Sequence, residues 1–330
     1  MVDAFKKYGK TGQFRNVVRS INDEVRGCYD KDKDEWSYDE AISLPKLVFH
    51  GTVKAHGTNT SITFCDGEII TAGRNKIVVV GDDNYGFSAW ANKPEVKQDL
   101  FDIVGNQNNI ILYGEWCGAG IRKGVAITGL DKMWIVFAAR ECGDDGDGGR
   151  WIDIKNLPYN NEAGIYNVNQ FGAYSVEIDF NNPQMSSPQL SSLVDKIEAE
   201  CPIGKHFGVS GIGEGAVFSH FLGGKRFVFK VKGQKHSVSK TKTLAPVDVE
   251  KLISINEFVD YSVTESRLEQ GAGEVLNGDF DRKNLGKFIK WMSTDIKKEE
   301  SDVLESNGLS MKDVGGGIAK ASKAWFFENE

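Results

Sequence analysis

Residues 47–64 read LVFHGTVKAHGTNTSITF, and this stretch sets the main structural expectation for the chain. Its two flanks, LVFHGTV and TSITF, are short runs of β-branched and aromatic residues, which are typical of strands. Between them, Lys54-Ala55-His56-Gly57-Thr58-Asn59 places one cation in a turn. A lysine in such a turn is a solvated surface residue in most proteins. The alternative is a nucleophile, which would need burial or nearby cations to remove the proton from its amine.

Similar strand-like runs continue up to about residue 240, separated by turns that contain glycine, aspartate or asparagine. Hairpin turns are predicted at Cys65-Asp66-Gly67 and at Leu222-Gly223-Gly224-Lys225. One helix is predicted within 186–202, where Pro202 follows a periodic stretch. The remaining strand-like runs are EIITAG, KIVVVG, NIILYGEW, MWIVFAAR, GAVFSHF and KRFVFKVK. We therefore expect an antiparallel, β-rich α+β domain over residues 1–240, which includes an N-terminal extension over 1–48.

The pattern changes after a linker predicted at HSVSKTKTLAPVD (236–248). From there on, apolar residues have helical spacing and β-branched runs are few. We expect a small all-helical domain over residues 246–330.

Composition narrows the class of protein. The chain has 330 residues and a net charge of -7, which lowers the odds of a general nucleic-acid binder without excluding a local basic groove. We find no apolar run long enough to span a membrane, and the N-terminus lacks the apolar core of a signal peptide. Five scattered cysteines without a CxxC pair argue against a zinc site and a disulfide framework, and they favour the cytosol.

Five further side chains could carry chemistry. Arg74 in TAGRNK is either a surface arginine or a residue whose guanidinium donates hydrogen bonds to a phosphate. Glu115 and Glu214 each follow a glycine at a strand edge, where a carboxylate is an ordinary turn residue, a partner for ribose hydroxyls or a metal ligand. Lys230 and Lys232 alternate with apolar residues in FVFKVKG and therefore point to one face. Such a pair is costly unless that face meets water or an anion.

Several common motifs of nucleotide and hydrolytic enzymes are absent from the sequence. GIGEGA lacks the strand–helix context of a dinucleotide fingerprint. No GxxxxGK[ST], HExxH or GxSxG motif occurs.

The order of the remaining motifs is more informative than any one of them. KAHGTN, Arg74, YGEW, Phe137 in WIVFAARE, EGAVF and FKVK follow one another from about residue 50 to 233. This order resembles the nucleotidyltransferase superfamily of ATP-dependent ligases and capping enzymes. Within it, the chain resembles the RNA ligases that include the second RNA ligase of T-even phages and the trypanosome RNA-editing ligases. The His-Gly dipeptide favours that branch, because DNA ligases and capping enzymes usually carry Asp-Gly.

The resemblance implies a nucleotidyltransferase (adenylyltransferase) domain followed by a helical domain. It implies that Lys54 is the nucleophile that takes AMP from ATP as a lysyl phosphoramidate. Lys230 and Lys232 would contact the ATP phosphates and, by their charge, lower the pKa of Lys54. Glu214 would bind the catalytic metal.

The resemblance implies nucleotide contacts for five other residues. His56 and Asn59 would support the phosphate and the active-site turn. Arg74 would contact a phosphate or the 3′-hydroxyl end of the acceptor. Glu115 would bind the ribose hydroxyls, and Phe137 would stack on adenine.

The function implied is an ATP-dependent RNA ligase that joins 3′-hydroxyl and 5′-phosphate ends through lysyl-AMP and an adenylylated 5′ end. Expected cofactors are ATP and Mg²⁺, with Mn²⁺ as a substitute. Expected partners are RNA ends, at nicks in duplex RNA or in an RNA–DNA hybrid. The protein is expected to be a cytoplasmic monomer without a membrane contact, in a host cell if a phage encodes it. The alternatives are an ATP-dependent DNA ligase, a capping-type enzyme and a non-catalytic RNA-end-binding module.

Overall fold

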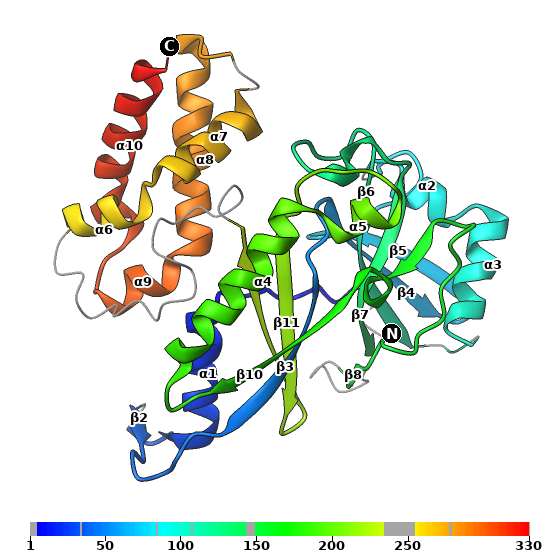
Figure 1. Cartoon of the computed structure of the whole chain (residues 1–330), viewed down its shortest axis with the longest axis horizontal. Helices are drawn as coiled ribbons and strands as arrows, with labels where there is room; N and C mark the ends of the chain where they lie inside the picture. The colour runs from blue at the N-terminus through cyan, green and yellow to red at the C-terminus, as the bar shows by residue number, and fades with distance from the viewer. Residues whose placement is uncertain are drawn as a thin grey trace.

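The computed structural model describes residues 5–33, 35–83, 85–105, 107, 109–142, 149–233, 255–276 and 279–329. These residues form a β-rich part up to residue 233 and a helical part from residue 255 (Figure 1). The expected α+β class is confirmed, with antiparallel sheets followed by C-terminal helices. The predicted linker over 236–248 lies outside the described residues.

A four-stranded and a six-stranded sheet build the described β-rich part. The first is antiparallel, with the order β10-β3-β11-β12. The second has the order β5-β4-β6-β7-β8, and β9 pairs with β7 in parallel. The first sheet consists of β3 (Lys46–Val53), β10 (Ala173–Asp179), β11 (Gly215–Leu222) and β12 (Lys225–Lys232). The second consists of β4 (Thr58–Cys65), β5 (Glu68–Gly73), β6 (Ile110–Cys117), β7 (Met133–Glu141), β8 (Trp151–Ile152) and β9 (Ile165–Asn167).

One face of the four-stranded sheet is apolar. Phe49, Phe218 and Phe229 point to this face and are fully buried. Helix α1 (Phe14–Arg26) packs against it, with the rings of Phe14 and Phe229 5.1 Å apart between centroids. Burial of these aromatic side chains stabilises the sheet and orients its other face.

The opposite face of the same sheet borders a cavity. Thr52, Val217 and Lys230 lie side by side in the register of β3, β11 and β12, and all three line this cavity. Because successive side chains of a strand alternate between faces, the apolar packing on one side determines which residues face the cavity.

Both predicted hairpins are confirmed. β4 and β5 are joined by Asp66 and Gly67, and β11 and β12 by Gly223 and Gly224. All four residues have positive φ, as the tight turns that match the twist of a hairpin require.

The strand predicted at KIVVVG is wrong. Residues 77–80 form only isolated bridges, and Val79 exchanges hydrogen bonds with Asp82 in a local turn. Ile77, Val79 and Val80 are between 45% and 63% exposed, whereas Val78 is buried and donates to Thr71 of β5, so the run contributes one side chain to the core without forming a strand. A short β-branched run predicts a strand only where a partner strand and a core are available.

Several elements were not predicted from the sequence. Among them are the hairpin of β1 (Gly27–Asp30) and β2 (Glu35–Tyr38), β8, β9, β10, α1, α2 (Phe87–Ala91), α3 (Pro94–Ile103) and α5 (Pro202–His206). The buried residues Phe14, Val17 and Ile21 of α1 have i, i+3, i+7 spacing, which is a readable helical signal. The predicted helix within 186–202 is confirmed as α4 (Ser187–Ala199), which packs against β11 and β12.

The helical part has a hydrophobic core of its own. Phe258, Phe288, Met292, Ile318 and Phe326 are central to this core. Its elements are α6 (Ile255–Ser262), α7 (Glu265–Val275), α8 (Leu285–Glu299), α9 (Ser301–Ser306) and α10 (Met311–Glu328). The separate cores support our proposal of two domains, over 1–240 and 246–330. No described helix is long and apolar enough to cross a membrane.

Candidate active site

The turn that carries Lys54 joins the two sheets. The Lys54 N–H donates to the carbonyl of Gly215 at 2.8 Å, which ties the turn to β11. The Gly57 N–H donates to Glu115 Oε1 at 3.0 Å, which ties it to β6. The turn is therefore held by one strand of each sheet.

Gly57 is required by close approach of the backbone. A Cβ added there would lie 2.3 Å from the carbonyl oxygen of Trp116. The Gly of the His-Gly dipeptide thus lets the turn pass against β6.

We expect Gly57→Ala to destabilise the protein by about 1–3 kcal/mol, because the new methyl group overpacks against backbone that cannot rotate away. The movement of the turn that this methyl group forces should also displace Lys54 and slow any reaction of its amine. Chemical denaturation measures the first effect. Gly129→Ala is the matched control, since nothing lies within 4 Å of its added Cβ; equal stability of the two variants would contradict the expectation.

Three basic side chains contact the carboxylate of Glu214. Its Oε2 lies 2.7 Å from Lys54 Nζ and 3.0 Å from His56 Nδ1, and its Oε1 lies 3.3 Å from Lys232 Nζ. The Glu214 side chain is only 4% exposed. Burial raises the pKa of this carboxyl, but Lys54, Lys232 and His56 outweigh burial and hold the pKa well below its usual value. Glu214 is therefore an anion at neutral pH.

Lys230 and Lys232 point to the same face of β12, as predicted, and both line the cavity. Burial lowers the pKa of Lys232, but Glu214 and Glu299 outweigh it, and the pKa lies above its usual value. Lys230 pairs with Glu299, which is the last residue of α8 in the helical domain. The face therefore meets anions, which was the condition for burying two lysines on it.

Glu115 and Asn59 lie opposite each other in the register of β6 and β4. Burial raises the pKa of Glu115; Lys54 and the Gly57 N–H lower it, and the charge of Glu214 raises it further, so that the pKa lies above its usual value. Both residues line the cavity next to the Lys54 turn. An amide and a carboxyl are thus available to a ligand beside the lysine.

Phe137 sits at an irregularity of the sheet. The pairing of β6 with β7 shifts between Tyr113 and Gly114, so that Ala138 and Val136 have partners and Phe137 has none. Such a bulge re-aims a side chain. Phe137 lines the cavity, and its ring packs edge-on against Tyr8 with centroids 5.1 Å apart.

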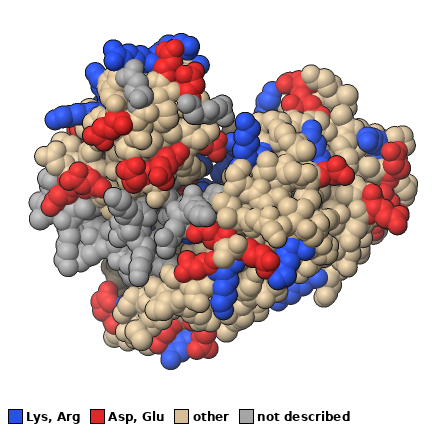
Figure 2. Space-filling model, turned by 45° about the horizontal axis from the view of Figure 1, so that its top comes forward, with Lys and Arg blue, Asp and Glu red and all other residues tan. Residues whose placement is uncertain are grey.

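All the candidate residues line one cavity of about 870 Å³. They are Lys54, His56, Asn59, Arg74, Glu115, Phe137, Glu214, Lys230 and Lys232. Arg74 is exposed and directly follows β5. Figure 2 shows a hollow between the helical and β-rich domains, with basic side chains inside and beside it. The volume is within the range of small-molecule sites.

Sequence reasoning missed two residues that complete this region. Arg122 donates from Nε to the carbonyl of Gly57 at 3.3 Å and pairs through Nη1 with Glu274 of α7 at 2.9 Å. Glu299 holds Lys230. No local pattern around either residue distinguishes it from a surface charge, because the carboxylate of Glu274 and the amine of Lys230 come from the other domain in each case.

A divalent metal is the cofactor that the resemblance implies besides ATP. Within the described ranges, no group of three or more His, Cys, Asp or Glu side chains could hold a metal ion. Mg²⁺ at nucleotide sites is instead held by one or two carboxylates together with phosphates and water. Glu214, ionised and close enough to Glu115 to affect its pKa, fits that donor set.

The match to a family model agrees with the motif order. The family model described as RNA ligase matches residues 48–232, which is more than half of the chain. No curated protein matches. A structure of the Naegleria gruberi RNA ligase with pyrophosphate is 19% identical, with a TM-score of 0.44, and the match covers 71% of this chain and 57% of that one. A mutant of that ligase with ATP and Mn is 18% identical, with a TM-score of 0.43 and coverages of 71% and 56%. The chain thus spans less than two thirds of the length of these structures.

Proposed function

The chain belongs to the RNA ligase family, and from this premise we propose that it joins RNA 3′-hydroxyl and 5′-phosphate ends at the expense of ATP. The observation that carries the proposal is the position of Lys54. Its amine lies in a cavity, 2.7 Å from an ionised carboxylate and beside two further lysines. A nucleophile surrounded by phosphate-binding groups suits phosphoryl transfer, where positioning and charge neutralisation supply most of the catalysis.

Three phosphoryl transfers make up the proposed reaction. The uncharged amine of Lys54 attacks the α-phosphorus of ATP, a P–N bond forms, and pyrophosphate leaves. The oxygen of an RNA 5′-phosphate then attacks the same phosphorus and releases the lysine. Finally a 3′-hydroxyl attacks the activated 5′ phosphorus, and AMP leaves.

The lining residues have separate roles in this proposal. Lys230 and Lys232 bind the phosphates of ATP, and Arg74 binds a phosphate or the acceptor end. His56 and Asn59 support the phosphate and the turn. Glu115 accepts from ribose hydroxyls, and Phe137 stacks on adenine from the bulge of β7. Glu214 would hold Mg²⁺ or Mn²⁺, which would neutralise phosphate charge.

We propose that the substrate is a nick in duplex RNA or in an RNA–DNA hybrid. The cytosolic location and the monomeric state stay predictions. The test incubates the protein with labelled ATP and Mg²⁺, and then with matched 5′-phosphorylated RNA and DNA ends. Label on the protein followed by sealed RNA supports the proposal. Adduct formation with GTP instead of ATP would indicate a capping-type enzyme, sealing of DNA alone would indicate a DNA ligase, and no adduct at all would indicate a binding module.

Removal of divalent cations should abolish adduct formation. With EDTA, we expect labelled protein to fall at least about 100-fold, because the charge of the triphosphate is then opposed only by side chains. Adding Mg²⁺ or Mn²⁺ in excess should restore it. Adduct formation that proceeds unchanged in EDTA would contradict the role given to the metal.

A further inference from the structure

The helical domain places a carboxylate on one of the phosphate-binding lysines. Glu299 Oε1 and Oε2 lie 3.0 and 2.9 Å from Lys230 Nζ. The two side chains are only 7% and 12% exposed. Both oxygens of one carboxylate therefore bind the amine to which the proposed function assigns an ATP phosphate.

Both partners of this contact are charged near neutral pH. Burial raises the pKa of Glu299, but Lys230 and Lys232 outweigh burial and lower the pKa to about 2. Burial lowers the pKa of Lys230 to about 8, although Glu299 acts in the opposite direction. A phosphate on Lys230 would bring a second anion against Glu299, and the low dielectric of the site strengthens the repulsion.

The helical domain also forms one wall of the cavity. The residues that it contributes are Gln270, Glu274, Trp291, Asp295, Lys298 and Glu299. Of its three carboxylates, Glu274 pairs with Arg122 and Asp295 with Arg267, whereas Glu299 faces Lys230. Glu299 is therefore the carboxylate of this wall that a phosphate on Lys230 would meet directly.

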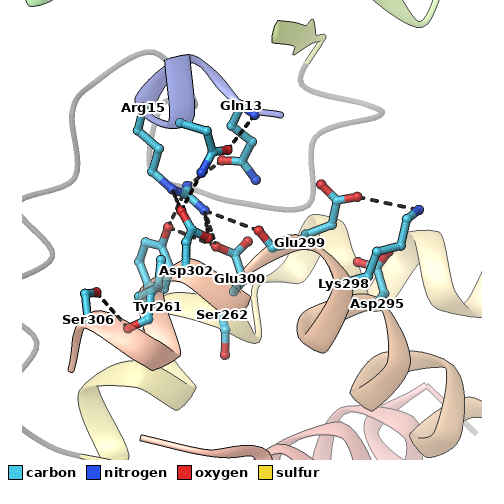
Figure 3. A network of polar contacts seen from close by, with 12 residues as sticks. Gln13, Arg15, Tyr261, Ser262, Asp295, Lys298, Glu299, Glu300, Asp302 and Ser306 are labelled. Atoms are coloured by element: carbon cyan, nitrogen blue, oxygen red, sulfur yellow. Dashed lines mark hydrogen bonds and ion pairs between the residues drawn. The ribbon is translucent and has the colours of Figure 1, made fainter. Parts of the chain in front are cut away.

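A second contact holds Glu299 in place from outside the cavity. Arg15 of α1 donates from Nη2 to Glu300 Oε2 at 2.8 Å and from Nε to Asp302 Oδ2 at 3.0 Å. Figure 3 shows Arg15 reaching from α1 into this group, directly beside Glu299. Glu300 also accepts from the fully buried Arg267 of α7 at 2.9 Å. Such a charge-assisted network defines one position of α8 against the N-terminal extension.

We infer that Glu299 competes with the β- and γ-phosphates of the nucleotide for Lys230. The helical domain, as seen here, covers the cavity in the steps that follow pyrophosphate release, and it withdraws when ATP or pyrophosphate binds. Glu299 thereby selects which anion occupies Lys230 at each stage. The inference rests on the proposed function, which assigns an ATP phosphate to Lys230. The competition between Glu299 and a phosphate is a binding equilibrium, so it can be measured without any covalent step.

The first test measures binding of inorganic pyrophosphate by calorimetry, in EDTA so that no metal takes part. Glu299→Gln keeps the shape of the side chain and removes its charge. We expect it to tighten pyrophosphate binding about tenfold, the usual size of a coupling between two sites. The matched control is Glu305→Gln, an exposed carboxylate on α9 outside the cavity, which should bind as wild type does. In a Lys230→Ala background, Glu299→Gln should change nothing, because the contested group is gone.

A second variant separates competition from a local change at Lys230. Arg15 does not itself line the cavity, although its Nη1 donates to Gln13, which does. Arg15→Gln removes the ion pairs that hold α8, and it should also tighten pyrophosphate binding. Unchanged affinity in both Glu299→Gln and Arg15→Gln would overturn the inference, as would equal tightening by Glu299→Gln with and without Lys230. Failure of the proposed function would appear differently, as wild-type protein that forms no AMP adduct while pyrophosphate binding still responds to Glu299.

Discussion

A Lys54→Ala protein should form no covalent AMP adduct, with a loss on the order of 10³-fold or more in the rate of labelling by ATP. Removing the nucleophile of an enzyme costs at least this much, since no neighbouring group can take its place at the same geometry. Other lysines line the cavity, among them Lys230 and Lys232, but the proposed function assigns these two to the phosphates of ATP and not to the attack on phosphorus. Denaturing gels after incubation with labelled ATP give the measurement.

Two further variants make this result specific. Lys46→Ala removes an exposed lysine at the start of β3, the strand that leads into the Lys54 turn, where it pairs with Asp179, and should label as wild type does. Lys54→Arg keeps a cation beside Glu214 but offers no neutral amine at neutral pH. It should retain the fold and form no adduct. Adduct formation by Lys54→Ala, mapped to any other residue, would disprove the assignment of the nucleophile.

Glu214→Ala should have the second largest effect, of about 10²–10³-fold on adduct formation. The carboxylate faces Lys54, His56 and Lys232, and its removal leaves these groups without their shared anion. Breaking a buried pair from one side also costs about 3–5 kcal/mol of stability. Glu214→Gln, which keeps the shape and an acceptor oxygen, should fall between alanine and wild type in both respects.

Stability and catalysis can be separated for Glu214. Denaturant unfolding reports the first, and single-turnover labelling below the unfolding transition reports the second. The pKa of Glu214 is lowered on folding, so its contribution to stability is present above the usual value of 4.5 and is lost as the pH falls below that value. Glu177→Gln, an exposed carboxylate on β10, is the control for loss of a charge. A Glu214→Ala protein that is labelled at the wild-type rate would contradict both the pairing and the metal role.

The sequence by itself determined the features that depend on neighbours in the chain. The hairpins were readable because Asp66-Gly67 and Gly223-Gly224 need positive φ, a requirement that two adjacent residues express. The shared direction of Lys230 and Lys232 followed from the two-residue period of a strand. The residues that the order of the motifs singled out line one cavity, while the roles given to them stay predictions.

Only the tertiary structure decided which groups touch. Lys54 meets Glu214 across 160 positions, and Arg15 meets Glu300 across 285. KIVVVG has the composition of a strand, but only Val78 of it enters the core, and its contacts with β5 stay isolated. β10 was missed although it pairs with β3 from Thr52 to Lys46.

The physical reason is that some features depend on residues close together in the sequence and others on residues far apart in it. Turn chemistry and side-chain alternation are set within a few residues, whereas partners are chosen by packing and loop closure over the whole chain. Glu299 is the clearest case. Its residue type and its neighbours in the sequence are those of a solvated helix end. It pairs with Lys230 only because Arg15 and the helical core hold α8 against the β-rich domain.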